Sequence, residues 1–273
     1  MIVTAVTEVG RNAAYRLGAA LLPAGAPHAH RLLISLVATT VTAAVVLAYC
    51  LLAERRSLSS LGLSWRRFPF DYALGLGGGV MLFGAAVLLC VATGTLTLTA
   101  TGMTAWGLWL LFIPGFLIQG MSEELLCRSY LMVSLSRGLP LWACAVTNAL
   151  LFSILHVGNT DIGIISLVNI FLFGLFASFL TLRRGSVLMA CGIHSAWNFA
   201  QGNLFGIPVS GIAAWPSPLS ARVADGALAD LWTGGTFGQE GGLSVTLILG
   251  IACILTLLLP SKSFGDKSSS VIE

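Results

Sequence analysis

The sequence predicts an all-α membrane protein, a polytopic helical bundle that crosses the bilayer about seven to eight times. Hydrophobic residues make up 56% of the 273 residues and charged residues only 9%, whereas soluble domains carry roughly 25% charged residues. The apolar residues gather in long runs, and a helix needs about 20 of them to cross a hydrocarbon core of about 30 Å. These two observations exclude an ordinary soluble protein.

Seven apolar runs are long enough to be candidate spans: 32–53, 72–93, 106 to about 135, 141–157, 162–182, 186–204 and 243–260. We therefore expect one transmembrane domain over residues 32–260, an N-terminal segment at 1–31 and a polar C-terminal tail at 261–273. Residues 1–22 are typical of an amphipathic helix lying in the membrane interface. Charged residues and prolines interrupt this region before a signal-peptide core can form.

The basic residues predict the orientation of the bundle, since loops retained in the cytoplasm are enriched in Lys and Arg. They follow the first, third, fifth and last spans, as Arg55, Arg56, Arg66, Arg67, Arg137, Arg183, Arg184, Lys262 and Lys267. The loops at 94–105 and 158–161 contain none. The odd-numbered spans are thus expected to end in the cytoplasm, which with seven spans places the N-terminus outside. Arg11, Arg16 and Arg31 oppose that placement, so a further segment near the N-terminus stays open.

Several features of the sequence carry little chemistry. The formal net charge of +3 is small and its basic residues are spread along loops, so nucleic-acid binding is not expected. The partners we expect are the lipid bilayer and membrane-associated molecules, and the composition and compact loops favour a bacterial plasma (inner) membrane. The cysteines form no CxxC pair and are expected to be small buried residues. The glycine-rich connection at 205–242 lacks a phosphate-binding motif, and we assign it no chemistry.

Ionisable side chains inside the predicted spans are the candidates for function. A charged group at membrane depth costs several kcal/mol unless it is paired or hydrated. The candidates are Glu123, Glu124 and Arg128 in the third span, His156 at the end of the fourth and His194 in the sixth.

Helical spacing separates the two carboxylates of the third span. Glu124 and Arg128 are four residues apart and share one helix face, which is the geometry of an intrahelical ion pair. Glu123 is rotated by about 100° and is left out of this pair. Adjacent carboxylates repel one another when both are ionised, so a purely structural role explains Glu123 poorly. For Glu124 and Arg128, bracing of the helix is an alternative to a direct role, and it also fits an active site.

The polar groups of three spans are expected to converge. His194 and the residue four positions later, Asn198, share one face of the sixth span. Counted from the basic ends of the helices at about 1.5 Å per residue, Glu123 and His156 lie about 21 and 24 Å deep, and His194 and Asn198 about 15 and 21 Å. All four groups can therefore meet at one level inside the bundle, as a catalytic site requires.

Three motifs in order resemble those of the CPBP family, the CAAX proteases and bacteriocin-processing or Abi proteins. They are Glu-Glu-x-x-x-Arg at 123–128, Phe-x-x-x-His at 152–156 and His-x-x-x-Asn at 194–198, on successive apolar segments. Each motif alone is weak, and the ordered set is specific. Cys127 and Ser129 stand where the family commonly has Phe and Gly, and eight spans are usual in the family.

The resemblance implies an intramembrane endopeptidase of CAAX-protease type that acts on a membrane-associated protein or peptide. Glu123 is then the general base that activates a water together with His156. His194 and Asn198 bind the oxyanion of the tetrahedral intermediate. The chemistry is coherent by itself, because a carboxylate can pass a proton from water to the leaving amine, and donors aimed at developing charge contribute about 3 to 4 kcal/mol each.

The resemblance requires no cofactor in our preferred interpretation, with zinc as the alternative. Two histidines and a glutamate can hold zinc with an open position, but the sequence contains no HExxH motif. If Asn198 donates a hydrogen bond to the oxyanion, few side chains are left as zinc ligands. Glu124 and Arg128 support the site in either interpretation.

Non-catalytic functions form the other class of hypotheses. One is a bacteriocin-immunity or adaptor membrane protein, and another is a small transporter whose buried Glu and His relay protons. A transporter predicts inverted repeats and broken helices at matching positions, which the sequence does not show. Asn148 and Asn169 are left outside the site, since an intramembrane Asn often only joins helices.

Overall fold

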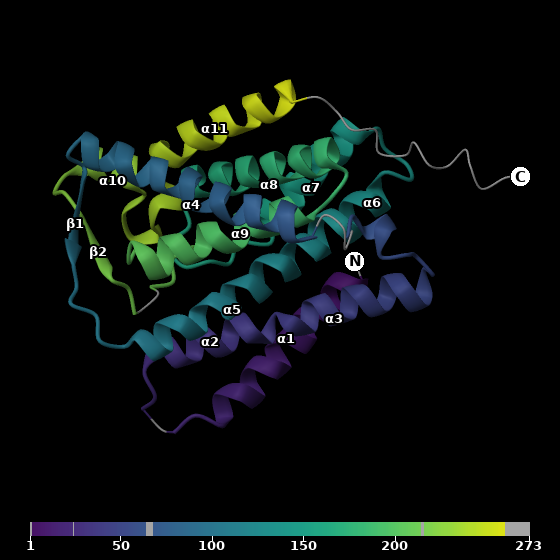
Figure 1. The fold of residues 1–273 in the computed structure, drawn as a ribbon, viewed down its shortest axis with the longest axis horizontal. Helices are drawn as coiled ribbons and strands as arrows, with labels where there is room; N and C mark the ends of the chain where they lie inside the picture. The colour runs from purple at the N-terminus through teal and green to yellow at the C-terminus, as the bar shows by residue number, and fades with distance from the viewer. Residues whose placement is uncertain (1, 24, 64–67, 214–215, 260–273) are drawn as a thin grey trace, which may run out of the picture.

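The long apolar runs form helices in the computed structural model (Figure 1). The structure describes residues 2–23, 25–63, 68–213 and 216–259. Outside this part lie some residues used above to predict orientation and the tail, namely Arg66, Arg67, Lys262, Lys267 and the segment 261–273.

The elements in chain order are α1 (Ile2–Ala20), α2 (His28–Ala38), α3 (Thr40–Ala48), α4 (Phe68–Ala92), β1 (Leu96–Ala100), α5 (Trp106–Glu124), α6 (Met132–Leu135), α7 (Leu141–Ile154), α8 (Ile164–Arg184), α9 (Leu188–Phe199), β2 (Leu219–Val223), α10 (Ala227–Thr233) and α11 (Leu243–Leu258). Wider π-helical turns continue three of these helices, at Tyr49–Ala53 after α3, Leu125–Leu131 after α5 and Ala200–Leu204 after α9. The protein is therefore mostly helical, as predicted.

Four of the predicted spans are helices long and apolar enough to cross a membrane: His28–Ala53, Phe68–Ala92, Trp106–Leu135 and Ile164–Arg184. The other three are helical but do not meet both criteria within the described ranges. Two of them are shorter apolar helices, α7 and α11. The third, α9, carries polar residues and is almost wholly buried. The structure thus confirms a membrane-type helical bundle and leaves the number of crossings as a prediction.

A small sheet at one end of the bundle corrects the all-α prediction (Figure 1). Strands β1 and β2 pair antiparallel, with Leu96 opposite Val223 and Ala100 opposite Leu219. The β1 segment alternates Leu with Thr, and such a period of two places alternate side chains on opposite faces of a strand. Leu96 is buried while its neighbour Thr97 is exposed. The sheet closes the end of the bundle at which α4 ends.

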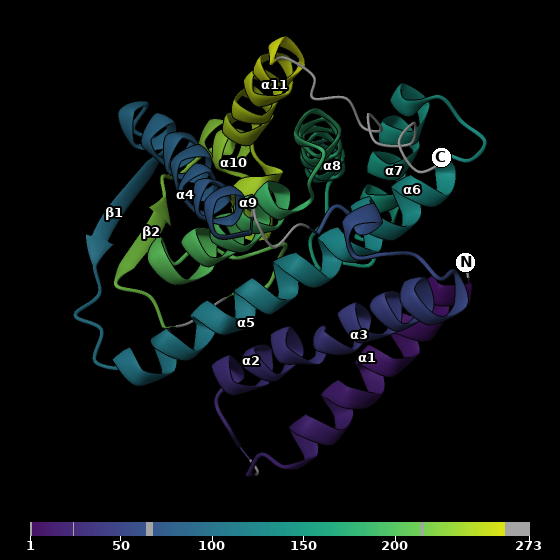
Figure 2. The ribbon, with the colours of Figure 1, turned by 45° about the vertical axis from the view of Figure 1, so that its right-hand side comes forward.

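The first three helices form a layer against α5 (Figure 2). Helix α1 confirms that the N-terminal segment is helical, and it packs antiparallel to α2 and α3. Gly10 faces Val41 and Gly18 faces Ile34, so closely that a Cβ on either glycine would lie within 3 Å of the partner side chain. The predicted position of α1 in the membrane interface stays a prediction.

Helix α9 lies at the centre of the bundle and packs between α4 and α5. Ten of its twelve residues are buried. The backbones of α4 and α9 approach closely at Gly75 and Gly192, where an added Cβ would collide with the carbonyl oxygen of Met189 or Tyr72 respectively. Because α9 is surrounded by protein, its polar side chains are held inside the bundle and not exposed to lipid.

Candidate active site

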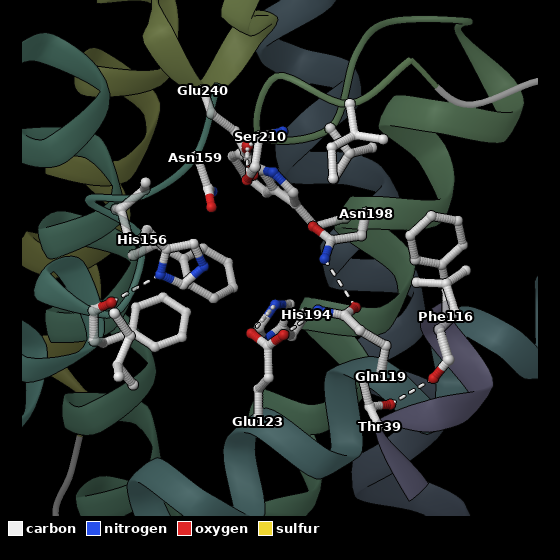
Figure 3. Close-up of a pocket in the computed structure, with 18 of the residues that line it drawn as sticks. Thr39, Phe116, Gln119, Glu123, His156, Asn159, His194, Asn198, Ser210 and Glu240 are labelled. Carbon is white, nitrogen blue, oxygen red and sulfur yellow. Dashed lines mark hydrogen bonds and ion pairs between the residues drawn. The ribbon is translucent and has the colours of Figure 1, made fainter. Parts of the chain in front are cut away.

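A cavity of about 250 Å³ inside the bundle contains four of the predicted site residues (Figure 3). Glu123, His156, His194 and Asn198 all line it. They come from the end of α5, from the turn after α7 and from α9. In Figure 3, His156 and Asn198 lie on opposite sides of the cavity, with Glu123 and His194 between them. The convergence of three spans that helical spacing predicted is therefore present in the structure.

Glu123 has one carboxylate oxygen with a hydrogen bond and one without. Its Oε1 accepts a hydrogen bond of 2.7 Å from Gln119 Nε2, one turn earlier on α5. Its Oε2 is buried without a hydrogen-bond partner in the described part of the chain and lies 3.6 Å from His194 Nε2. The Glu123 side chain is 29% exposed, in contrast to fully buried Glu124. Glu123 is thus the carboxylate that a molecule in the cavity can reach.

Glu124 and Arg128 form the predicted ion pair, with 2.9 Å between Arg128 Nη1 and Glu124 Oε1 and both side chains fully buried. Arg128 Nη2 also donates to the carbonyl oxygen of Gly174 on α8 at 3.1 Å. An added Cβ at Gly174 would lie 3.0 Å from the Cα of Ala149, so a larger residue would separate α7 from α8. Neither Glu124 nor Arg128 lines the cavity, and the pair supports the site from behind.

His194 connects the two glutamates. Its Nδ1 lies 2.8 Å from Glu124 Oε1, and its Nε2 lies 3.6 Å from Glu123 Oε2. Because an ionised carboxylate only accepts hydrogen bonds, Nδ1 donates its proton to Glu124. The neutral ring then offers Nε2 as an acceptor, and only the doubly protonated ring donates from both nitrogens. The buried ion pair therefore fixes both the orientation and the Nδ1 proton of His194.

His156 is oriented by its own helix turn. Its Nδ1 lies 2.8 Å from the carbonyl oxygen of Phe152, and the centroids of the His156 and Phe152 rings lie 4.7 Å apart. Since a carbonyl only accepts, Nδ1 carries the proton and Nε2 is left as an acceptor. The two residues of the Phe-x-x-x-His motif are thus in contact. The Arg128 guanidinium carbon lies 4.6 Å from the centroid of the Phe152 ring. The centroids of the Phe152 and His194 rings lie 5.9 Å apart.

Gln119 was not predicted and joins two of the predicted residues. Asn198 Nδ2 donates to Gln119 Oε1 at 3.0 Å, while Gln119 Nε2 donates to Glu123 (Figure 3). The side chain is 8% exposed and lines the cavity. A sequence signal existed, because Gln119 is a polar residue in an apolar span, four positions before Glu123 and on the same helix face.

Close packing of α5 on α9 sets the distances within the site. A Cβ added to Gly120 would lie 2.7 Å from the backbone nitrogen of Ser195. These two residues are sequence neighbours of Gln119 and His194. A π-helical turn follows Glu124 and contains Arg128, at 125–131, and another follows α9 at 200–204. Such turns occur often at functional sites.

The glycine-rich connection at 205–242 reaches the cavity, which the sequence interpretation did not foresee. Ser210 and Glu240 both line it, and the Glu240 carboxylate accepts two hydrogen bonds from Ser210. Glu8 and Arg11 of α1 also line the cavity and form an ion pair of 2.6 Å. The N-terminal helix and the connection thus both contribute to the site.

Asn148 and Asn169, which the sequence analysis left outside the site, make structural contacts. Asn148 Nδ2 donates to the carbonyl oxygen of Cys127. Asn169 Nδ2 donates to the carbonyl oxygens of Glu240 and Gly242, and its Oδ1 accepts from Thr246. Asn169 also lies in the cavity lining, where it anchors the glycine-rich connection.

The predicted zinc alternative finds few ligands. Within the described ranges, no group of three or more His, Cys, Asp or Glu side chains is arranged to hold a metal ion. One ring nitrogen of His194 is used by Glu124, and one of His156 by the carbonyl oxygen of Phe152. Each ring keeps its second nitrogen, as a metal-bound histidine also does, so metal dependence stays a prediction to be tested.

The fold and the site define a membrane-embedded helical protein with a carboxylate and two histidines in a buried cavity. Residues 105–200 match the family model described as type II CAAX prenyl endopeptidase Rce1-like. The match begins one residue before α5 and ends one residue after α9, so it contains all six predicted site residues. It confirms the family resemblance of the three motifs and supports an intramembrane endopeptidase in general. No curated protein and no solved structure matches the chain.

Proposed function

We propose that this protein is an intramembrane endopeptidase of CAAX-protease type that hydrolyses peptide bonds with a water activated by Glu123. The observation that carries the proposal is the setting of Glu123: its side chain lines a cavity shared with two histidines and an asparagine, and its buried Oε2 has no hydrogen-bond partner in the described part of the chain. The proposed substrate is a membrane-associated protein or peptide, and the proposed location is the bacterial plasma membrane.

In the first step, Glu123 removes a proton from water while the water oxygen attacks the carbonyl carbon of the peptide bond. Gln119 holds the other Glu123 oxygen, so Oε2 is the oxygen proposed to take the proton. His156 supports this step, since its Nε2 is the ring nitrogen left to accept a hydrogen bond from the same water. General-base catalysis of this kind contributes about 10²- to 10⁴-fold in rate.

The negative charge of the tetrahedral intermediate is proposed to be stabilised by His194 and Asn198. One Asn198 N–H is used by Gln119, and the second is available for the oxyanion. His194 can donate from Nε2 only when it also keeps its Nδ1 proton on Glu124, so the proposed role requires the doubly protonated ring. Carboxylates lie beside both of its nitrogens.

In the last step the C–N bond breaks as Glu123 returns its proton to the leaving amine. One product then ends in a carboxylate and the other in an amine, and Glu123 is regenerated as a carboxylate. The Glu124–Arg128 pair is not consumed, and it keeps His194 in place throughout. No cofactor takes part in this scheme.

Cleavage by purified protein tests the proposal. A hydrophobic membrane peptide is incubated with wild type, Glu123→Gln, His156→Ala and His194→Ala, each with and without a chelator. We expect Glu123→Gln to fold and insert normally because it keeps the shape of the side chain, and to lose at least about 10²-fold in kcat because it cannot accept the proton.

Three outcomes of this experiment would overturn parts of the proposal. Full activity of Glu123→Gln would exclude the glutamate mechanism. Complete loss with chelator that zinc restores would replace it with the metal-dependent alternative. If wild type cleaves nothing while all variants keep an associated phenotype such as bacteriocin resistance, a non-catalytic immunity or adaptor role is correct.

A further inference from the structure

A tight turn at Val209–Ile212 brings the connection between α9 and α11 to the cavity. Val209 and Ile212 exchange two backbone hydrogen bonds, of 2.8 and 2.9 Å. The two residues between them both have positive φ, 48° for Ser210 and 82° for Gly211. Consecutive positive φ values define a type I′ turn, in which glycine and asparagine are the usual residues. Serine in this position therefore needs support from its surroundings.

Glu240 supplies that support. Its Oε2 accepts hydrogen bonds from Ser210 N at 2.9 Å and from Ser210 Oγ at 2.7 Å. Glu240 is in turn held through its backbone, because its carbonyl oxygen accepts from Asn169 Nδ2 at 2.8 Å. In Figure 3, Ser210 and Glu240 lie together on the side of the cavity away from Glu123.

The turn is also seated against the segment that follows His156. Gly211 N donates to the carbonyl oxygen of Phe237 at 2.9 Å. A Cβ on Gly211 would collide with the carbonyl oxygen of Thr160, so only glycine fits here in both conformation and space. Since Asn159, the neighbour of Thr160, lines the cavity with His156, the position of the turn is tied to this wall of the site.

The two ends of the turn present apolar side chains to the cavity. Val209 packs on a buried cluster from α2 and α5 that contains Ala29, Leu36, Phe112 and Phe116. Ile212 is 44% exposed, although it is large and apolar, and it belongs to the cavity lining. A rim formed by an anchored valine and an accessible isoleucine suits an apolar side chain of a bound peptide.

We propose that Glu240 is a positioning residue that holds the Val209–Ile212 turn against the cavity, and that this turn forms a subsite selecting an apolar side chain of the peptide near the cleaved bond. The inference rests on the proposed endopeptidase function. Glu240 contacts Ser210 and acts through it, and takes no part in the proton transfers assigned to Glu123.

Peptide binding tests the subsite without depending on cleavage. All variants are made in the Glu123→Gln background, and the probe is a set of fluorescent hydrophobic peptides in which one position at a time is Ala, Val, Leu or Phe. We expect Glu240→Ala to weaken binding of the preferred peptide about tenfold, as hydrogen bonds to a charged group contribute at this level. We expect Ile212→Ala to shift the preference toward the larger side chains.

A rescue separates positioning from direct contact. Glycine adopts positive φ without help, so Ser210→Gly should restore most of the binding lost in Glu240→Ala. If Glu240 instead contacts the peptide itself, Ser210→Gly will not restore binding. The matched control is Asp225→Asn, which removes an exposed carboxylate from the same connection and should leave binding and unfolding temperature unchanged.

The outcomes distinguish this inference from the proposed function. The inference would be overturned if Glu240→Ala and Ile212→Ala left both the affinity and the peptide preference unchanged. It would also be overturned if these variants unfolded and lost affinity equally for every peptide. Peptide binding with the expected selectivity, but no cleavage by wild type, would retain the subsite and refute the endopeptidase. Absence of peptide binding in the Glu123→Gln protein would overturn the subsite.

Discussion

The two adjacent glutamates of α5 differ in burial and in the side chains that they contact. Glu124 is fully buried and contacts both Arg128 and His194 through one oxygen. Glu123 is partly exposed to the cavity and contacts Gln119. Because adjacent helix residues point about 100° apart, the Glu124 side chain points into the protein and the Glu123 side chain toward the cavity.

Removing one member of the buried ion pair should destabilise the protein more than removing Glu123. Glu124→Gln or Arg128→Met leaves the partner charge buried without a counterion, which costs roughly 3 to 5 kcal/mol. The double variant should recover part of this loss, because no isolated charge is left. Unfolding in detergent measures the difference, with Glu123→Gln as the matched carboxylate control. Equal stability of Glu124→Gln and Glu123→Gln would contradict the bracing role.

Gln119 should affect catalysis more than stability. Gln119→Leu keeps the approximate size of the side chain but frees Glu123 Oε1 and one N–H of Asn198, and misplacement of a reacting group by about 1 Å can cost about 10²-fold in rate. We expect kcat to fall by about 10- to 100-fold, with an insertion level close to wild type. Peptide cleavage and the unfolding temperature are measured on the same preparation. A change in KM alone would show that Gln119 contacts the substrate and does not orient Glu123.

At the scale of elements, the site depends on how closely α5 approaches α9. Gly120 makes this approach possible, because a Cβ there would lie 2.7 Å from the backbone nitrogen of Ser195. The neighbouring residue His194 bonds Glu124, four positions along α5 from Gly120. Any separation of the two helices therefore lengthens the contact that orients His194.

Gly120→Ala should reduce activity in a protein that still folds. We expect a loss of about 10²-fold in kcat/KM, since the histidine moves relative to Glu123. Gly107→Ala is the matched control on the same helix: nothing lies within 4 Å of its added Cβ, and alanine is a better helix former by about 1 kcal/mol. Full activity in Gly120→Ala would mean that the helices adjust without disturbing the site.

The sequence predicted those elements whose signal is local. Apolar runs located the helices to within a few residues, and i, i+4 spacing predicted the Glu124–Arg128 pair. The pairing of β1 with β2 joins residues more than a hundred positions apart, and no local pattern reports such a partner. The same holds for Ser210 and Glu240, whose role depends on a turn that folds back onto the cavity. The roles assigned to the site residues stay predictions.

At the scale of the whole molecule, the basic ends of the helices gather at one end of the bundle. Glu54 pairs with Arg56 at 3.3 Å and with Arg137 at 3.6 Å, and Asp71 at the start of α4 pairs with Arg184 at the end of α8. The β1–β2 sheet lies at the opposite end (Figure 1). This clustering places the basic ends on one side of the bundle, as the predicted orientation requires, and the assignment of that side to the cytoplasm stays a prediction.

Helix α1 changes the expectation for the N-terminus. Because Gly10 faces Val41 and Gly18 faces Ile34, α1 runs antiparallel to α2 and α3, and its beginning lies near the basic end of the bundle (Figure 1). Glu8 and Arg11 line the cavity and pair with each other, and pairing lowers the cost of a charge at membrane depth. Arg11 and Arg16 lie within α1 and so no longer mark an external loop if α1 crosses, whereas Arg31 at the start of α2 stays at the end away from the basic loops. Within the described part of the chain, α1 is not among the helices long and apolar enough to cross a membrane by composition, so its crossing is a prediction.

We therefore predict that the N-terminus lies on the same side as the basic loops. Single cysteines are introduced at three exposed positions, Ala5, Ser57 and Thr99, and intact cells are treated with a membrane-impermeant maleimide. The six native cysteines are buried and should give little background. Thr99→Cys should react in intact cells, whereas Ala5→Cys and Ser57→Cys should react only after the cells are opened. Reaction of Ala5→Cys in intact cells would instead place the N-terminus outside, as expected for seven spans with α1 in the membrane interface.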